Sequence, residues 1–442
     1  MMEARFLRGS VRLAMVAAAA ALVVGCGLKE DDPVVVPAPG GAVVQGPVKD
    51  AVVFADKIPA GQTRGNGVVD ADEKAYSTTT DASGNWKLTA VPPYDYEIVS
   101  LGGTDTITSQ PAITMRAEGG KAGQTVTAQA VTPLTTLVQL TPETDRAALK
   151  TTIQSLGVAY NAKIDEGITP AAAALVKAVT TTATKVVEVL NAAAGGDANT
   201  RQLSTQAVKS VQTEVLSALA STLVGKSAAQ LDSSAEIATI TQTATTTAVT
   251  AIAADASKAG GVQLTISAPA ITQVAQAVAT STTQVVTAIA TASGGSLSSD
   301  ASSRKPEAQI VVQSVTTAIT NETSAASATQ VVQAANVTAV PPENRAPTIT
   351  GGASASGTVG LSFTYTPTVA DADGDLLTLS ISGSKAVPPG LTFNPLTGEI
   401  TGIPTASGSG TYTLTVSDGR KTASLTVTLS FTRTTGATGA TF

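Results

Sequence analysis

The chain has 442 residues, which is enough for about three domains of ~150 residues each. Charged residues make up 14% of it and aromatic residues 3%, so the 43% of hydrophobic residues is mostly Ala and Val, and the cores must be built from small side chains. The absence of His excludes catalysis by imidazole and metal ligation through imidazole. A single Cys excludes an internal disulfide or a thiolate cluster. The net charge of −6 argues against a nucleic-acid partner. Composition therefore favours a binding or structural protein over an enzyme.

The first 25 residues have the pattern of a targeting segment. Three arginines precede an apolar stretch at 13–24, which is too short to span a bilayer comfortably. The stretch ends in the small residues of Val-Val-Gly followed by Cys26, the single cysteine of the chain. This pattern resembles the lipobox of bacterial lipoproteins; the alternative is a plain secretory signal with a chance cysteine. The resemblance implies that residues 1–25 are a signal peptide and that Cys26 is lipidated.

The expected location follows from the residues around Cys26. A lipidated Cys26 would anchor the protein to a membrane of the cell envelope. Gly27 stands where an Asp would signal retention in the inner membrane, so the resemblance implies the outer membrane or the cell surface. Residues 26–41 are charged and then rich in Pro and Gly, which is typical of a tether.

Residues 42–132 are expected to be β-rich. Short runs such as AVVFAD, WKLTAV and YEIVSL alternate with Gly, Pro, Asp and Asn turns. The segment that contains NGVVDADEKAYSTTTDASGNWKLT resembles the β-sandwich repeat of bacterial surface and adhesion proteins. The resemblance implies an N-terminal β-sandwich.

Residues 133–340 are expected to form a helical stalk or bundle. Thr169-Pro170, Ser233 with Glu236, and Ser267 with Pro269 are helix-start patterns, and glycine pairs follow the apolar repeats. Residues 176–196 and 275–295 match at nine of 21 positions, which indicates a duplicated helical unit. Because Thr and Val are mediocre helix formers, a β-solenoid is the alternative.

Residues 341–431 are again expected to be β. Apolar and polar residues alternate strictly in LTLSIS, TYTLTVSD and ASLTVTLSF. The motifs PGLTF at 389–393, TGEITGIP at 397–404 and VSDG at 416–419 resemble the putative-Ig or dystroglycan-type cadherin-like domain of bacterial surface proteins. The resemblance implies an Ig-type β-sandwich, and residues 432–442 are expected to be a flexible tail. The whole chain is thus a β + α + β multidomain protein.

The first candidate metal site lies in the N-terminal β region. Four residues fit positions 5, 6, 9 and 12 of a calcium-binding loop: Asn66, Gly67, Asp70 and Glu73. Positions 1 and 3 would be Gln62 and Arg64, which do not fit, and Asp56 could contribute only if residues 59–65 loop out. The alternative is a hydrated acidic turn.

The second candidate metal site is an Asp-rich loop. Asp371, Asp373 and Asp375 alternate along it, and alternate carboxylates on a short loop can converge on a hard cation such as calcium. The cadherin-like resemblance adds Glu343, Asn344 and Asp418 as further ligands. Such domains hold calcium between tandem copies, whereas this chain has one copy, so a hydrated β-turn is the alternative.

These features predict a lipid-anchored surface protein with an adhesion or structural role. Its expected partners are surface proteins or polysaccharide, and calcium is its expected stabilising ion. The alternative is a polysaccharide- or solute-binding lipoprotein. That alternative requires exposed aromatic rings, and Trp86 is expected instead to fill a β core.

Overall fold

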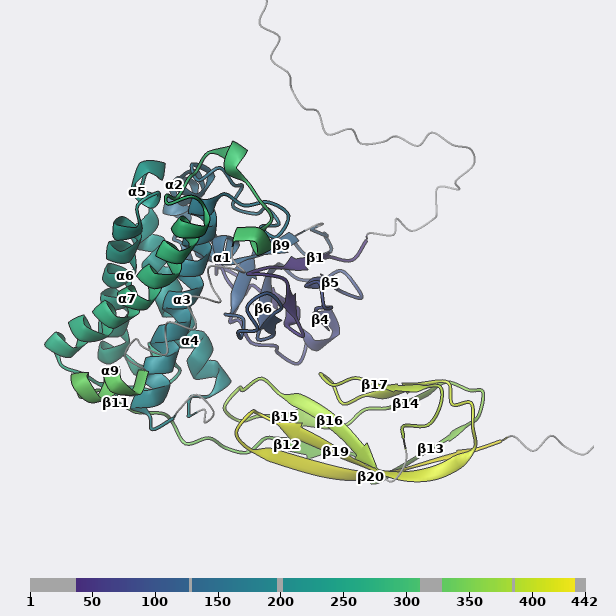
Figure 1. Ribbon diagram of the computed structural model, residues 1–442. Helices are drawn as coiled ribbons and strands as arrows, with labels where there is room; N and C mark the ends of the chain where they lie inside the picture. Colours follow the sequence, from purple (N-terminus) through teal and green to yellow (C-terminus); the bar gives the residue numbers. More distant parts are fainter. Residues whose placement is uncertain (1–36, 127–128, 197–201, 311–327, 384–385, 434–442) are drawn as a thin grey trace, which may run out of the picture. The chain divides into compact units, whose positions relative to one another are not determined.

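The computed structural model describes residues 37–126, 129–196, 202–310, 328–383 and 386–433 (Figure 1). The targeting segment with Cys26, most of the tether, and residues 434–442 of the tail lie outside this part of the chain. Within the described residues no helix is long and apolar enough to cross a membrane.

The N-terminal region is β-rich, as the sequence predicts. It contains nine strands: β1 (Gly40–Val43), β2 (Val48–Lys49), β3 (Val52–Lys57), β4 (Ser77–Thr79), β5 (Asn85–Lys87), β6 (Tyr96–Leu101), β7 (Thr104–Asp105), β8 (Met115–Ala117) and β9 (Gln129–Val131). One sheet has the order β4-β3-β6-β8, a second has the order β5-β1-β9, and β2 pairs with β7. Strands β3 and β6 are almost wholly buried, which explains their continuous apolar runs.

The central region is helical, so the β-solenoid alternative is wrong. Its main helices are α1 (Pro133–Leu140), α2 (Glu143–Gln154), α3 (Pro170–Ala193), α4 (Thr205–Leu223), α5 (Ala228–Leu231), α6 (Ser234–Ala254), α7 (Ala268–Ala292) and α9 (Ala328–Ala335). Thr169, Ser233 and Ser267 accept the N-cap hydrogen bonds that their sequence patterns predict. Two short strands, β10 (Gln263–Thr265) and β11 (Thr338–Val340), pair antiparallel within the region expected to be helical.

The two halves of the duplicated unit pack against each other. They correspond to α3 and α7, which are in contact along their lengths, with the hydroxyls of Thr182 and Thr282 3.3 Å apart. Helix α3 is buried on nearly every side, whereas α7 has one buried face. Small Ala and Val side chains allow this close approach.

The N-terminal strands and the helices share one hydrophobic core. A single cluster of buried side chains runs from Val43, Ile98 and Met115 of the strands to Val176 and Val286 of the helices. Strand β8 is the edge of its sheet, and helices cover it: the Arg116 amide donates to Thr136 Oγ1 of α1, and the Thr114 amide donates to Gln212 Oε1 of α4, both at 2.9 Å. The helices thus pack as a bundle onto the strands, and residues 37–340 are called the body below.

The C-terminal region has its own core. Its strands are β12 (Thr348–Thr350), β13 (Ser354–Thr358), β14 (Phe363–Tyr365), β15 (Thr368–Ala370), β16 (Thr378–Gly383), β17 (Leu391–Phe393), β18 (Ile400–Gly402), β19 (Gly408–Ser417) and β20 (Thr422–Thr432). They form sheets of order β13-β20-β19-β16 and β14-β18-β17, with β12 paired to β15. Alternate residues of β19 and β20 are buried, as the sequence alternation predicts: Tyr412, Leu414, Val416, Val427, Leu429 and Phe431.

Candidate functional site

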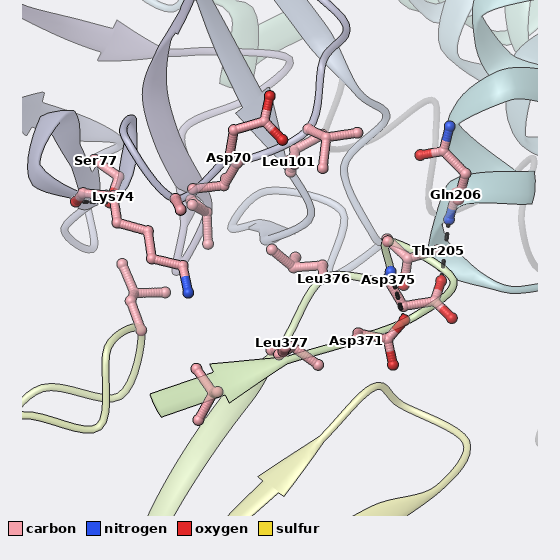
Figure 2. Close-up of a pocket in the computed structure, with 18 of the residues that line it drawn as sticks. Asp70, Lys74, Ser77, Leu101, Thr205, Gln206, Asp371, Asp375, Leu376 and Leu377 are labelled. Carbon is pink, nitrogen blue, oxygen red and sulfur yellow. Dashed lines mark hydrogen bonds between the residues drawn. The ribbon is translucent and has the colours of Figure 1, made fainter. Parts of the chain in front are cut away.

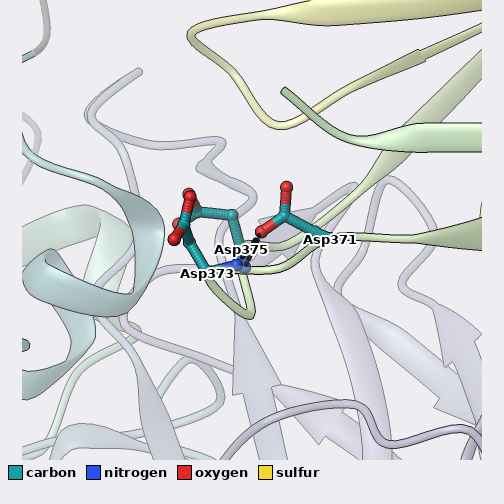
Figure 3. Close-up of side chains that lie close together, drawn as sticks. All are labelled: Asp371, Asp373 and Asp375. Carbon is teal, nitrogen blue, oxygen red and sulfur yellow. Dashed lines mark hydrogen bonds between the residues drawn. The ribbon is translucent and has the colours of Figure 1, made fainter. Parts of the chain in front are cut away.

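The Asp-rich loop of the C-terminal region lies between β15 and β16. Asp371 Oδ1 accepts hydrogen bonds from the amides of Asp373 and Asp375 at 2.8 and 3.1 Å, which curls the loop around the first carboxylate (Figures 2 and 3). Each of the three side chains offers one oxygen within 4.8 Å of the others. Among the described residues this is the one group of three or more acidic, His or Cys side chains close enough to hold a metal ion.

A basic side chain also contacts this loop. The Arg345 guanidinium lies 2.7 Å from Asp373 Oδ1, and the Arg345 amide donates to Asp373 Oδ2 at 2.6 Å. The hydrogen bond from Arg345 lowers the pKa of Asp373 and raises that of Arg345. Sequence reasoning missed Arg345, although it directly follows Glu343 and Asn344 in the linker.

The three other predicted ligands occupy different positions. Burial alone would raise the pKa of Asp418, but hydrogen bonds from the Lys421 amide, the Asn344 side chain and the Arg420 amide lower it. These bonds use both Asp418 carboxylate oxygens. Asn344 is buried and its Oδ1 has no partner within the described residues. Glu343 is exposed and makes no ion pair in the same part of the chain.

The donor set fits calcium in part. Asp371 Oδ2, Asp375 Oδ2 and Asn344 Oδ1 have no hydrogen-bond partner among the described residues. Calcium takes six to eight oxygen ligands, so water would have to complete the shell. Arg345 holds Asp373 and would compete with the ion for that carboxylate.

The first acidic cluster is a network that braces a loop. Glu73 accepts hydrogen bonds from the amides of Lys57 and Asp70 at 2.6 and 2.9 Å, and the Asn66 side chain bonds to Asp70 and to the Val68 amide. Asp70 precedes the 3-10 turn Lys74–Tyr76, which leads into β4, and is labelled in Figure 2. Backbone amides therefore use the oxygens that a calcium ion would need.

Asp56 belongs to a buried ion cluster and contacts the loop of this network through the Gly67 amide. Asp56 and Glu97 face each other in the register of β3 and β6, and Arg116 of β8 bonds to Glu97 at 2.5 Å and lies 3.4 Å from Asp56. All three side chains are at most 6% exposed. Burial raises the pKa of Asp56 to about 7, with Arg116 opposing the rise. Asp56 Oδ2 also accepts from the Gly67 amide at 2.6 Å.

Gly67 is required at its position by this cluster. Its φ of +68° favours glycine, and a Cβ there would lie 2.3 Å from Arg116 Nη2. The glycine that the sequence places in a calcium-loop pattern thus makes room for a guanidinium. Glu97 and Arg116 were missed; the signal for Glu97 is a carboxylate within the apolar run YEIVSL.

A second buried charge cluster was also missed. Lys177 of α3 is 5% exposed, donates to the Gln45 carbonyl, and lies 3.5 Å from Asp105 and 3.2 Å from Glu307. Burial raises the pKa of Glu307 to about 7, with Lys177 opposing the rise. A lysine in the middle of an Ala- and Val-rich helix is the sequence signal for such a cluster.

The aromatic side chains of the N-terminal region supply no open stacking platform. Trp86 is 4% exposed and lies in the core of the body. Tyr94 is half-buried, packs edge-to-face on Tyr76, and has Lys57 over its ring.

Comparisons with known proteins concern the C-terminal region. Residues 346–435 match the family model described as a putative Ig domain. No curated protein matches the chain. Together with the strand order, the family match identifies the C-terminal region as an Ig-like domain.

Similar solved structures cover about a fifth of the chain. They include a putative alpha-galactosidase from Bacteroides fragilis at 19% identity, human protocadherin-24 EC1-2 at 22% and Drosophila N-cadherin EC1-3 at 10%. The alignments cover 20%, 20% and 22% of this chain, with TM-scores of 0.18, 0.18 and 0.19. The chain spans 17%, 44% and 37% of the length of those proteins.

Proposed function

We propose that the protein is a lipid-anchored protein of a bacterial cell surface whose C-terminal Ig-like domain has an adhesion or other interaction role. The observation that carries the proposal is the Ig-like domain, found at the end of the chain opposite to the lipobox-like sequence. Under this proposal the N-terminal strands form an adhesin-type repeat. The proposed role is binding, and the absence of His leaves no imidazole for acid–base catalysis.

The lipid anchor is tested by changing the lipobox-like sequence. Cys26→Ala is expected to move the protein from the membrane to a soluble fraction, and mass spectrometry of the N-terminal peptide is expected to find lipid on Cys26 of the parent chain. Gly27→Asp keeps the cysteine and, in a cell with two membranes, is expected to shift the protein to the inner membrane. Unchanged pelleting of Cys26→Ala, with no lipid on the peptide, would refute the anchor.

Surface exposure is tested by adding protease to intact cells. We expect cleavage in the Ig-like domain of the anchored protein, and binding of the purified protein to cells or envelope components that is lost when residues 341–442 are removed. Full protection on intact cells, with cleavage only after lysis, would instead support a scaffold role inside the envelope.

Calcium is proposed as a weak stabilising ligand of the Asp-rich loop. Support comes from the converging oxygens of Asp371, Asp373 and Asp375 and from the unpartnered Asn344 Oδ1. An ion that binds only the folded state raises its melting temperature. Calcium at ~10 mM, above the ~0.1–1 mM dissociation constants of extracellular modules, is therefore expected to stabilise the domain more than magnesium does.

Two variants make the calcium test sharp. Asp373→Asn should abolish the calcium-dependent rise in melting temperature. Arg345→Ala should increase it, since the competing guanidinium is gone. A thermal shift that is the same in both variants would place any bound calcium elsewhere.

The alternative function, a polysaccharide- or solute-binding lipoprotein, gains no support from aromatic rings. Neutral sugars are commonly held by exposed rings, and Trp86 is buried.

A further inference from the structure

A polar groove of about 570 Å³ lies on the body. Its walls are the loop at 61–66, Arg116 of β8, one face of α4, and the 3-10 turn Ala256–Ala259. No residue of the Ig-like domain lines it, whereas Asn66 and Arg116 belong both to its lining and to the acidic networks described above.

The groove concentrates positive charge on an otherwise acidic chain. Four basic side chains line it against a single carboxylate, that of Glu214, which pairs with Lys258 at 3.1 Å. The other three are Arg64, Arg116 and Lys209. The net charge of the whole chain is −6, so this excess is local and depends on the fold.

Lys209 is a buried cation with donor capacity left over. It is 6% exposed, and its ammonium donates to the carbonyl oxygens of Asn66 and Gly67 at 3.0 and 3.2 Å. An ammonium has three donors, so one remains for a ligand. Its hydrogen-bond partners are neutral carbonyls, and burial together with the nearby Arg116 lowers the pKa of Lys209 to about 8, with Asp56 and Asp70 opposing the change.

Arg64 is a second basic side chain of the groove lining and is more exposed than Lys209. It is half-buried and has no hydrogen-bond or ion-pair partner among the described residues. Burial lowers its pKa, and the positive charges of Arg116 and Arg146 lower it further. Its planar fork of donors matches the geometry of a carboxylate, sulfate or phosphate. Arg116 repels both Arg64 and Lys209, and an anion bound between them would relieve that repulsion.

The rest of the lining is suited to an oxygen-rich ligand. The hydroxyls of Ser210 and Thr213 lie on the α4 wall and have no hydrogen-bond partner within the described residues. No aromatic ring lines the groove. These features favour hydrogen bonding and charge over stacking.

We propose that this groove binds a compact oxyanion group, a sulfate, phosphate or carboxylate, with Arg64 and Lys209 as its direct contacts. Arg116 contributes positive charge while Glu97 and Asp56 hold it in place. The site gives the protein a ligand of its own, independent of the Ig-like domain.

The test is calorimetric titration of the full chain at constant ionic strength, with chloride as the reference salt. The probes are inorganic sulfate, inorganic phosphate and glucuronate. We expect saturable heat with at least one of them, and about a tenfold or greater loss of affinity in Arg64→Ala, as expected for a charged hydrogen bond. Arg64 is partnerless, so the variant should melt at or above the parent temperature without anion.

The matched control is Lys121→Ala, which removes one positive charge from an exposed pair on the same body. It should bind the probes as the parent does. Tighter binding of glucuronate than of the inorganic ions would identify an acidic sugar as the ligand class. Equal binding would show that the oxyanion group alone sets the affinity. No saturable heat, or an equal loss in Arg64→Ala and Lys121→Ala, would overturn the proposal.

Discussion

The body and the Ig-like domain use charge in opposite ways. The body buries two ion clusters, Asp56–Glu97–Arg116 between strands and Asp105–Lys177–Glu307 between a strand and two helical segments. The Ig-like domain fills its core with apolar and aromatic side chains, and its buried polar groups, Asn344, Asp375 and Asp418, lie outside that core. Its Asp-rich loop pairs with an exposed Arg345. Strands in which apolar and polar residues alternate over many positions can fill a core with apolar side chains alone. A body built largely from Ala and Val gains less burial per residue, and its ion clusters tie its elements together.

The largest expected effect is the loss of Arg116. Arg116→Met leaves two buried carboxylates without a counter-charge, and breaking a buried pair in this way costs about 3–5 kcal/mol. Denaturant unfolding of the body should record this loss. Adding Asp56→Asn and Glu97→Gln should restore much of it, whereas Lys121→Ala should have little effect. A small loss of unfolding free energy in Arg116→Met would mean that the ion cluster does not hold the strands together.

Next in size is a truncation in the Ig-like core. Leu414 of β19 is fully buried, and Leu414→Ala should cost about 2–5 kcal/mol. Because the two cores are separate, calorimetry should show that the variant lowers one transition, and that Leu137→Ala lowers the other. The exposed Leu361 provides the control, since Leu361→Ala should change neither. Equal shifts of both transitions would show that the cores unfold together.

A change of pH should act on the body with a defined sign. The pKa of Asp56 is raised to about 7, so between about pH 4 and 7 the folded state keeps a proton that the unfolded chain releases. The stability contributed by this proton is fully present below about pH 4 and is lost as the pH rises through 7. From pH 5 to 7.5 the loss should be on the order of 2 kcal/mol.

Two variants separate the contributions to this pH dependence. Asp56→Asn and Glu307→Gln should each flatten the pH dependence of the body's transition. The pKa of Asp373 is lowered by Arg345, so its small contribution has the opposite sign and is lost only as the pH falls below its ordinary value. A body that becomes more stable from pH 5 to 7.5 would contradict the raised pKa of Asp56.

The smallest expected effect concerns the Asp-rich loop without calcium. Asp373 pairs with an exposed guanidinium, and exposed ion pairs contribute little. Asp373→Asn in chelator should therefore shift the melting temperature by less than about 1 °C. A large shift under these conditions would mean that the loop carries part of the domain's stability without any ion.

Local patterns predicted much of the fold. The helix starts at Thr169, Ser233 and Ser267 and the strand alternation of the Ig-like domain depend on neighbours in the chain, which the sequence displays directly. Partners far apart in the chain were not predictable. Asp56 was a candidate beside Asn66 and Glu73 only if residues 59–65 loop out, and no local pattern indicates that strand pairing sets it opposite Glu97 and next to Arg116, 60 residues away. The same limit hid Arg64 and Lys209, which only the packing of α4 against a loop brings together.

The two duplicated helices differ at a position that decides which of them can occupy the buried site next to Asp105 and Glu307. In the alignment of the two copies Lys177 of α3 corresponds to Gln276 of α7, and Gln276 is exposed. The two copies match at nine of 21 aligned positions. A glutamine at the position of Lys177 would leave Asp105 and Glu307 without a cation in a buried place, which is strongly unfavourable. Lys177 therefore distinguishes the two copies, because it neutralises the buried carboxylates beside α3 and Gln276 of α7 could not.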